Sequence, residues 1–162
     1  MQHPLQISRK IEYGLRAMSF LASVPGDQPV PFREIARRMQ VPQSFLAKIM
    51  KVLVLRGLVR ATRGAHGGYA LMRPAREISF LEVIEAVEGP LRVSLCETHA
   101  GSCRASDTCT MYGVWMQGRE KMLEVFRAQT LDTLAMSELR VPPAAPRDGP
   151  VSLGLPARSA SN

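Results

Sequence analysis

The chain has 162 residues, of which 46% are hydrophobic, 22% are charged and 6% are aromatic, and its formal net charge is +7. That length suits a single domain with a sizeable core, and no stretch is long and apolar enough to span a bilayer or to act as a secretory signal. Three cysteines are too few, and odd in number, for a disulfide framework, so we expect a cytoplasmic protein with no membrane partner.

The charge is distributed unevenly along the chain. Residues 1–76 carry a net charge of +10, residues 77–139 carry −5 and residues 140–162 carry +2. A basic half beside an acidic half indicates one surface for a polyanion and another for a different role, with a merely solvated basic face as the alternative.

The first predicted helix covers residues 7–22, where four apolar residues recur at helical spacing. Ser8 is placed to cap its start, and Pro25-Gly26-Asp27 is placed to end it. The apolar positions are Ile11, Leu15, Met18 and Ala22.

Two shorter helices follow, separated by the break Gln40-Val41-Pro42. Pro31 suits the first turn of one helix, and Gly57 is placed to cap the end of the other. Their apolar positions are Ile35, Ala36, Met39, Leu46, Ile49, Met50 and Leu53. Two short helices joined by a tight turn form the helix-turn-helix pattern, which alone is a weak signal because many helical hairpins bind nothing.

A short β-hairpin is predicted next, with strands Leu58–Ala61 and Tyr69–Met72 on either side of the glycine-rich residues 62–68. The tip lacks the Lys-Ser/Thr ending of a nucleotide-binding loop. Helix, turn, helix and basic hairpin together predict a winged helix-turn-helix DNA-binding region in residues 1–76, within a mainly α fold that has a small β wing.

In a helix-turn-helix the second helix enters the major groove with its first residues nearest to the bases. We therefore expect residues 43–45 at base edges, the two following lysines and an arginine of the preceding helix at phosphates, and the wing residues at the minor groove. The expected DNA-binding set is Arg33, Gln43, Ser44, Phe45, Lys48, Lys51, Arg63 and His66. The alternative for each is a solvated side chain, and for Phe45 it is packing beneath the turn.

Residues 77–139 are expected to hold a cysteine loop and a dimerisation helix. Ser79 and Glu82 form the capping box of a helix that ends before Gly89-Pro90. A long helix is predicted from about Thr110 to Met136, with a stripe that we assign to a subunit interface rather than to the core. The stripe consists of Met111, Trp115, Gly118, Met122 and Phe126. Residues 140–162 are rich in Pro, Gly, Ala and Ser, so we expect a disordered tail.

All three cysteines lie in the loop predicted over residues 94–110, with the spacing C-x6-C-x5-C. They are Cys96, Cys103 and Cys109. Scattered buried thiols are the plain interpretation, but the clustering argues against it. Structural zinc usually shows close C-x2-C pairs, so an iron–sulfur cluster is favoured over zinc, which stays an alternative.

The runs Tyr13–Ala17, Arg63–Tyr69 and Val83–Gly89, with the helix-turn-helix and the three cysteines, resemble the Rrf family of bacterial winged-helix regulators over residues 5 to about 137. The resemblance implies a homodimer joined by the long helix. It also implies that Cys96, Cys103 and Cys109 hold an iron–sulfur cluster (2Fe–2S or 4Fe–4S) that controls binding to double-stranded operator DNA.

Two features depart from the family pattern. The first gap between cysteines has six residues, where IscR-like and NsrR-like members typically have five, and Tyr112 stands where IscR-like members have a histidine. NsrR-like members can use an acid on the first helix instead, so the resemblance points to Glu12 as a fourth ligand. A local ion pair with Arg16 is the alternative role for Glu12, and His99 and Asp107 are alternative ligands.

The sequence thus predicts a transcriptional regulator, expected to be a repressor, whose cluster senses redox, nitric oxide or iron status. The alternatives are a thiol- or zinc-sensing DNA-binding regulator without a cluster, and a winged-helix module that binds protein. Because no nucleophile–base pair or paired-carboxylate pattern is present, we predict that the chain is not an enzyme.

Overall fold

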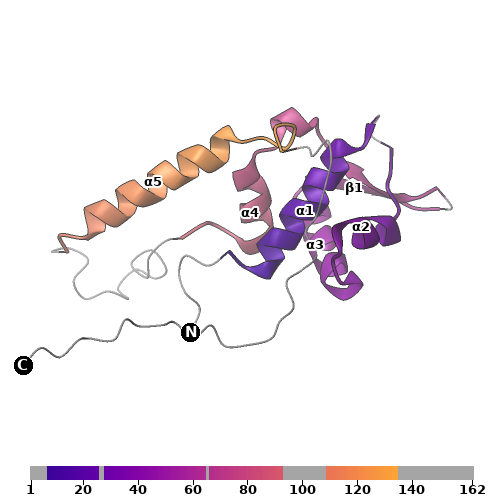
Figure 1. Cartoon of the computed structure of the whole chain (residues 1–162), viewed down its shortest axis with the longest axis horizontal. Helices are drawn as coiled ribbons and strands as arrows, with labels where there is room; N and C mark the ends of the chain where they lie inside the picture. The colour runs from indigo at the N-terminus through magenta and orange to yellow at the C-terminus, as the bar shows by residue number, and fades with distance from the viewer. Residues whose placement is uncertain (1–6, 26–27, 65, 93–108, 135–162) are drawn as a thin grey trace, which may run out of the picture.

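The computed structural model describes residues 7–25, 28–64, 66–92 and 109–134. Within them it has five α-helices, one short 3-10 helix and a two-stranded antiparallel sheet (Figure 1). The elements are α1 (Arg9–Ser23), α2 (Phe32–Met39), α3 (Gln43–Leu55), β1 (Val59–Thr62), β2 (Gly68–Leu71), η2 (Ala75–Glu77), α4 (Phe80–Glu88) and α5 (Tyr112–Ala128). The predicted fold class, mainly α with a small β wing, is confirmed.

Helix α1 is the centre of the molecule and contacts α2, α3, α4 and β2. The Ser8 side chain accepts a hydrogen bond from the Ile11 amide and caps the helix start, as the sequence predicted. A Cβ at Gly14 would lie 2.9 Å from the Val87 side chain, so the glycine allows α1 and α4 to pack closely. Figure 1 shows α1 and α4 side by side between α5 and the α2–α3 pair.

One hydrophobic core joins the two halves of the sequence. Leu46, Ile49 and Leu53 of α3 belong to it together with Val83 of α4 and Leu131 beyond α5. Helix α4 begins with the predicted capping box, because Ser79 accepts from the Glu82 amide and the Glu82 carboxylate accepts from the Ser79 amide. Residues before and after position 76 therefore pack into the same core and stabilise each other.

Helix α5 differs from its prediction, which ran from about Thr110 to Met136. It ends at Ala128, and the chain then turns so that Leu131 enters the core with no exposed surface. The Leu131 amide donates to the Ile78 carbonyl at 3.0 Å and the Phe80 amide donates to the Gln129 carbonyl at 2.8 Å. These long-range hydrogen bonds stop the helix where local propensity would continue it.

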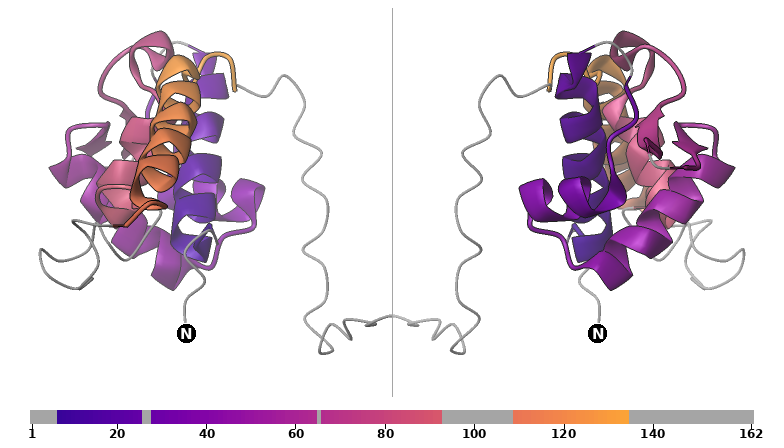
Figure 2. Two further views of the ribbon diagram at one scale, coloured as in Figure 1. Left: turned by 90° about the vertical axis from the view of Figure 1, so that its left-hand side faces the viewer. Right: turned by 90° about the vertical axis from the view of Figure 1, so that its right-hand side faces the viewer.

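The predicted stripe on α5 divides into two parts. Met111 and Trp115 are exposed, whereas Phe126 is half-buried against Phe80, with ring centroids 5.1 Å apart. The residue of α5 that enters the core is Leu123, which the stripe did not include. The left view of Figure 2 looks at the molecule from the side of α5, and there α5 lies in front of α4 and α1.

The other boundaries differ from prediction by one or two residues. The strands run over Val59–Thr62 and Gly68–Leu71 instead of Leu58–Ala61 and Tyr69–Met72, and Pro31 precedes α2 as its N-cap. Gly57 follows the end of α3 with a left-handed φ of 70°, which confirms its role there. Among the described helices, none is both long and apolar enough to cross a membrane.

Candidate nucleic-acid interface and cysteine segment

The turn between α2 and α3 is built by three residues. Gln40 adopts the left-handed conformation (φ 53°, ψ 41°), and its amide donates to carbonyls in the last turn of α2. Val41 is 4% exposed and its amide donates to the Ala36 carbonyl at 3.0 Å. Pro42 then starts α3 with a fixed φ. The buried valine and the ordered cap hold α3 at a fixed angle to α2.

Helix α3 buries one face and exposes the other. Leu46, Ile49, Met50 and Leu53 are buried. The exposed residues that the sequence predicted at DNA form what we call the recognition face: Gln43, Ser44, Phe45, Lys48 and Lys51. The structure thus brings all five together on one helix, as predicted, without testing whether they contact DNA.

The wing, residues 59–71, is an antiparallel hairpin in which Val59 pairs with Leu71 and Thr62 with Gly68. Arg63 and His66 lie exposed near its tip, where Gly64 has a φ of 110°. A Cβ at Gly67 would lie 2.3 Å from the Thr62 carbonyl oxygen, so the tip accommodates only glycine there.

The sequence did not predict a third extended segment beside the wing. Val30 and Tyr69 exchange two backbone hydrogen bonds, of 2.8 and 2.9 Å, and the Phe32 ring lies 6.3 Å from the Tyr69 ring. A single bridging residue has no periodicity, so no sequence pattern could have identified it. The bridge ties the wing to the start of α2, where Arg33 is exposed.

Cations on the interface differ in whether they are neutralised. Arg37 and Arg38 on α2 both pair with Glu34, at 2.8 and 2.9 Å. The hydrogen bonds from Arg37 and then Arg38 hold the pKa of Glu34 below its ordinary value. The spacing of Glu34 to both arginines would have revealed this cluster in the sequence.

The cations predicted at phosphates, and the wing arginine predicted at the minor groove, differ from these. Within the described part of the chain, Arg33, Lys48, Lys51 and Arg63 form no ion pair with an acid. Their charges are therefore available to an external polyanion.

The cysteine segment, residues 94–110, lies largely outside the described residues. Cys96, Cys103, His99 and Asp107 fall there, whereas Cys109 is half-buried and its carbonyl accepts from the Tyr112 amide at the start of α5. Among the described residues, no three His, Cys, Asp or Glu side chains are grouped so as to hold a metal. Because Cys96 and Cys103 lie outside the described residues, the described part of the chain does not test the predicted ligand set.

Glu12 lies on α1 one helical turn after Ser8, the residue that caps this helix. Its carboxylate pairs with Arg16 at 2.5 Å and lies 3.8 Å from Arg9, so the ion pair considered as its alternative role is formed. Ser8 donates to the Glu88 carboxylate at 2.8 Å, and Lys10 donates to the Val87 carbonyl. These bonds hold the start of α1 against the end of α4, four residues before the described chain stops at residue 92.

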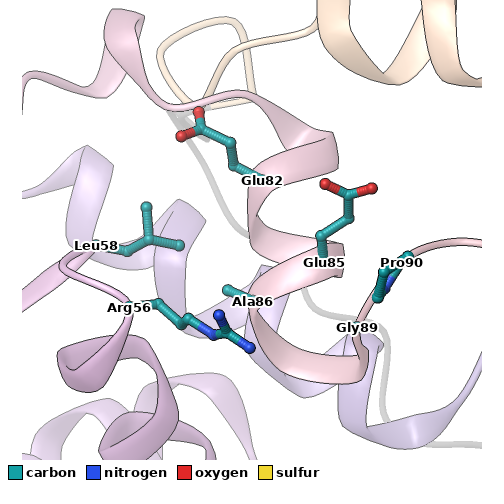
Figure 3. Close-up of a pocket in the computed structure, with 7 residues that line it drawn as sticks. All are labelled: Arg56, Leu58, Glu82, Glu85, Ala86, Gly89 and Pro90. Carbon is teal, nitrogen blue, oxygen red and sulfur yellow. The ribbon is translucent and has the colours of Figure 1, made fainter.

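An open pocket of about 370 Å³ lies between the end of α3 and α4 (Figure 3). Arg56 reaches toward Ala86, whereas the carboxylates of Glu82 and Glu85 lie toward the other end of α4. Glu82 is already bonded to Arg73 and Ser79. The charged groups of this pocket do not converge on one point, as they do in most ligand sites.

Comparison with known proteins gives one consistent result. The Rrf2 family model, described as an iron-dependent transcriptional regulator, matches residues 7–137. Rv1287 of Mycobacterium tuberculosis, whose name describes it provisionally as an HTH-type transcriptional regulator, is 35% identical over 132 residues, which cover 81% of each chain.

Solved structures of transcriptional regulators share the fold at 30% identity or more. CymR, the global cysteine regulator of B. subtilis, superimposes with a TM-score of 0.68 at 30% identity, covering 81% of this chain and 96% of CymR. IscR of T. potens superimposes with a TM-score of 0.65 at 32% identity, covering 83% of this chain and 89% of IscR.

Proposed function

Because the chain belongs to the Rrf2 family of transcriptional regulators, we propose that it is a homodimeric repressor whose operator affinity is controlled by an iron–sulfur cluster. In this proposal Cys96, Cys103 and Cys109 are ligands and Glu12 is the fourth. Regulators of transcription are not enzymes, which agrees with the sequence prediction. The cytoplasm is the compartment in which such a protein meets its operator.

The observation that carries the proposal is the contact between the end of α4, where the cysteine segment begins, and the start of α1, the helix that carries Glu12. Along the chain the segment then leads to the start of α5, where the Cys109 carbonyl accepts from the Tyr112 amide. Three thiolates and one carboxylate oxygen suit an iron–sulfur cluster with one weakly held iron. When bound, such a cluster supplies a centre that reacts with oxidants and nitric oxide and loses iron.

The chain's own residues would connect this segment to DNA binding. Helix α4 packs against α1 and α3, and α3 carries the recognition face. The exposed cations Lys48, Lys51, Arg33 and Arg63 supply the sequence-independent attraction to phosphates. Holding or releasing the cysteine segment changes the restraints on the end of α4 and on the start of α5. This change biases the positions of the two winged helices of the dimer relative to two half-sites.

The homodimer is supported by the outer face of α5. Met111, Val114, Trp115 and Val125 are 62%, 70%, 46% and 58% exposed. Gly118 lies among them, and a Cβ added there would meet nothing within 4 Å. So many exposed apolar side chains on one helix are typical of an interface, and a second copy of the same helix is the partner proposed here.

Anaerobic purification of the full-length protein tests the cluster. We expect a coloured protein with visible absorption, and iron and inorganic sulfide in amounts that define the cluster type. Cys103→Ala should lose both colour and the response of operator affinity to nitric oxide or oxidant, while its far-ultraviolet circular dichroism stays unchanged. A colourless protein with stoichiometric zinc would exclude the cluster.

A thiol sensor without a cluster is the second candidate. It is favoured by the similarity to CymR, described as a global cysteine regulator, and by the half-buried free thiol of Cys109. Such a protein would be colourless and free of iron, and each Cys→Ala variant would alter the response of DNA binding to oxidant. Metal and sulfide analysis separates the two candidates.

A further inference from the structure

Phe45 is an exposed aromatic residue in the first turn of the recognition helix. Its side chain is 54% exposed, although the next residue, Leu46, is completely buried. Its neighbours Gln43 and Ser44 are exposed and polar. Covering a large, water-exposed apolar ring with another apolar group lowers the free energy of the system.

One edge of the Phe45 ring is held in place. The ring contacts Tyr13 of α1 in an edge-on arrangement, with centroids 6.3 Å apart and planes inclined at 69°. Tyr13 is itself buried, so it fixes the direction of Phe45 rather than moving with it. The sequence left open whether Phe45 packs beneath the turn, and the structure shows both a packed edge and an exposed remainder.

The chemistry of the ring limits what it can recognise in DNA. Phenylalanine has no hydrogen-bond donor or charge, so it can satisfy neither a phosphate nor the polar edge of a base. The apolar group displayed in the major groove is the C5 methyl of thymine. We propose, on the basis of the DNA-binding function proposed above, that Phe45 reads a thymine methyl in each half-site of the operator.

The neighbouring side chains fit this assignment. Gln43 can bond the N6/N7 edge of adenine, and Ser44 can bond either a base or a phosphate. The same helix face therefore combines polar readout with one apolar contact. Lys48, one turn further on and also exposed, supplies charge without base preference.

The test removes the methyl group from the DNA instead of changing the protein. Sequences bound by the full-length protein are first selected from a random duplex pool. The selection is done with an anaerobic and with a chelator-treated protein preparation, and the preparation that binds DNA more tightly is used from then on. Each thymine of the selected half-site is then replaced singly by deoxyuridine, which pairs identically but lacks the methyl. Wild-type affinity should fall about fourfold at one position, and about fifteenfold when both half-sites are changed.

Phe45→Ala should bind the thymine probe more weakly and show no further loss with deoxyuridine at that position. Leu55→Ala is the matched control, because Leu55 is an apolar residue of α3 that is 75% exposed at the other end of the helix. It should keep the full sensitivity to deoxyuridine. The deoxyuridine result with wild-type protein does not depend on whether Phe45→Ala folds.

The inference would be overturned, with DNA binding left intact, by equal wild-type affinity for thymine and deoxyuridine at every position, or by a selected half-site without thymine. Failure to select any duplex DNA would overturn both the inference and the proposed function. A Phe45→Ala variant that retains its sensitivity to deoxyuridine would show that another residue reads the methyl.

Discussion

Lys48 and Lys51 are exposed, carry no ion pair within the described chain and lie on the outer face of α3. Each is therefore expected to meet a phosphate rather than a base. Replacing either by Ala should weaken binding to all duplex sequences and reduce the slope of log affinity against log salt by about 0.9 for each protomer, or about 1.8 for the proposed dimer. Gel-shift or anisotropy titrations at several salt concentrations measure this slope.

Lys121 provides the control for that prediction. It lies on α5 and pairs with Glu124 at 2.8 Å, so Lys121→Ala should leave the salt slope unchanged. Gln43→Ala should behave differently again, because a lost base contact alters the preferred sequence more than the slope. Unchanged binding by both lysine variants at physiological salt would mean that α3 does not face the DNA as proposed.

Glu12 has two possible roles that separate experimentally. As the partner of Arg16 it takes part in an ion pair at the surface, which is worth about 0.5 kcal/mol or less. As a cluster ligand it would affect the visible spectrum. We expect Glu12→Ala to shift the absorption bands of the anaerobic protein and to speed the loss of iron, whereas Arg16→Ala, which breaks the same ion pair, should leave the spectrum unchanged. Identical spectra for the two variants would assign Glu12 to the ion pair alone.

At the scale of the element, the start of α4 offers a test of stability. Partial burial raises the pKa of Glu82, but hydrogen bonds from the Ser79 amide and Arg73 outweigh it, so the pKa lies below its ordinary value of 4.5. A lowered pKa stabilises the fold above pH 4.5, and this contribution disappears as the pH falls through the pKa of the folded state.

Glu82→Gln should therefore lower the urea midpoint at pH 7 and lose this difference at an acidic pH below the folded-state pKa of Glu82, because glutamine keeps a capping oxygen but not the charge. Ser79→Ala removes the cap itself and should cost about 1 kcal/mol at both pH values. A deficit of Glu82→Gln that stays constant between the two pH values would show that the charge of Glu82 contributes nothing.

Local signals predicted most elements well, because their causes lie within a few residues. The capping box at Ser79 and Glu82 and the left-handed Gly57 are of this kind. The end of α5 is not, because residues 129–136 contain neither Gly nor Pro, and the helix is stopped by the pairing of residues 129–131 with residues 78–80. Pairing at long range has no local signature, so the sequence overextended this helix.

The candidate site shows the same division. Exposure of Gln43, Ser44 and Lys48 follows from helical periodicity once the buried face is known, and the structure agrees. The bond from Ser8 to Glu88 spans 80 positions and could not be deduced from spacing. It nevertheless helps to hold the start of α1, the helix that carries Glu12, against the end of α4.

At the scale of the whole molecule, α5 lies on one side of the α1–α4 pair, and α2 and α3 lie on the other (Figure 1). A dimer formed through α5 would therefore leave both recognition faces open to DNA. Leu123 and Phe126 turn toward the core, so the apolar residues at 111, 114, 115 and 125 are left to meet a partner.

Val125→Arg places a charge on this face, near the end of α5, and should convert the dimer to a monomer, as measured by analytical ultracentrifugation. Because two linked half-site contacts bind far more tightly than one, operator affinity should fall by roughly a hundredfold or more. Gln117→Arg adds the same charge at an exposed polar position of the same helix and should remain dimeric. A dimeric Val125→Arg protein with wild-type affinity would move the subunit interface away from α5, and with it the explanation for so much apolar surface on that helix.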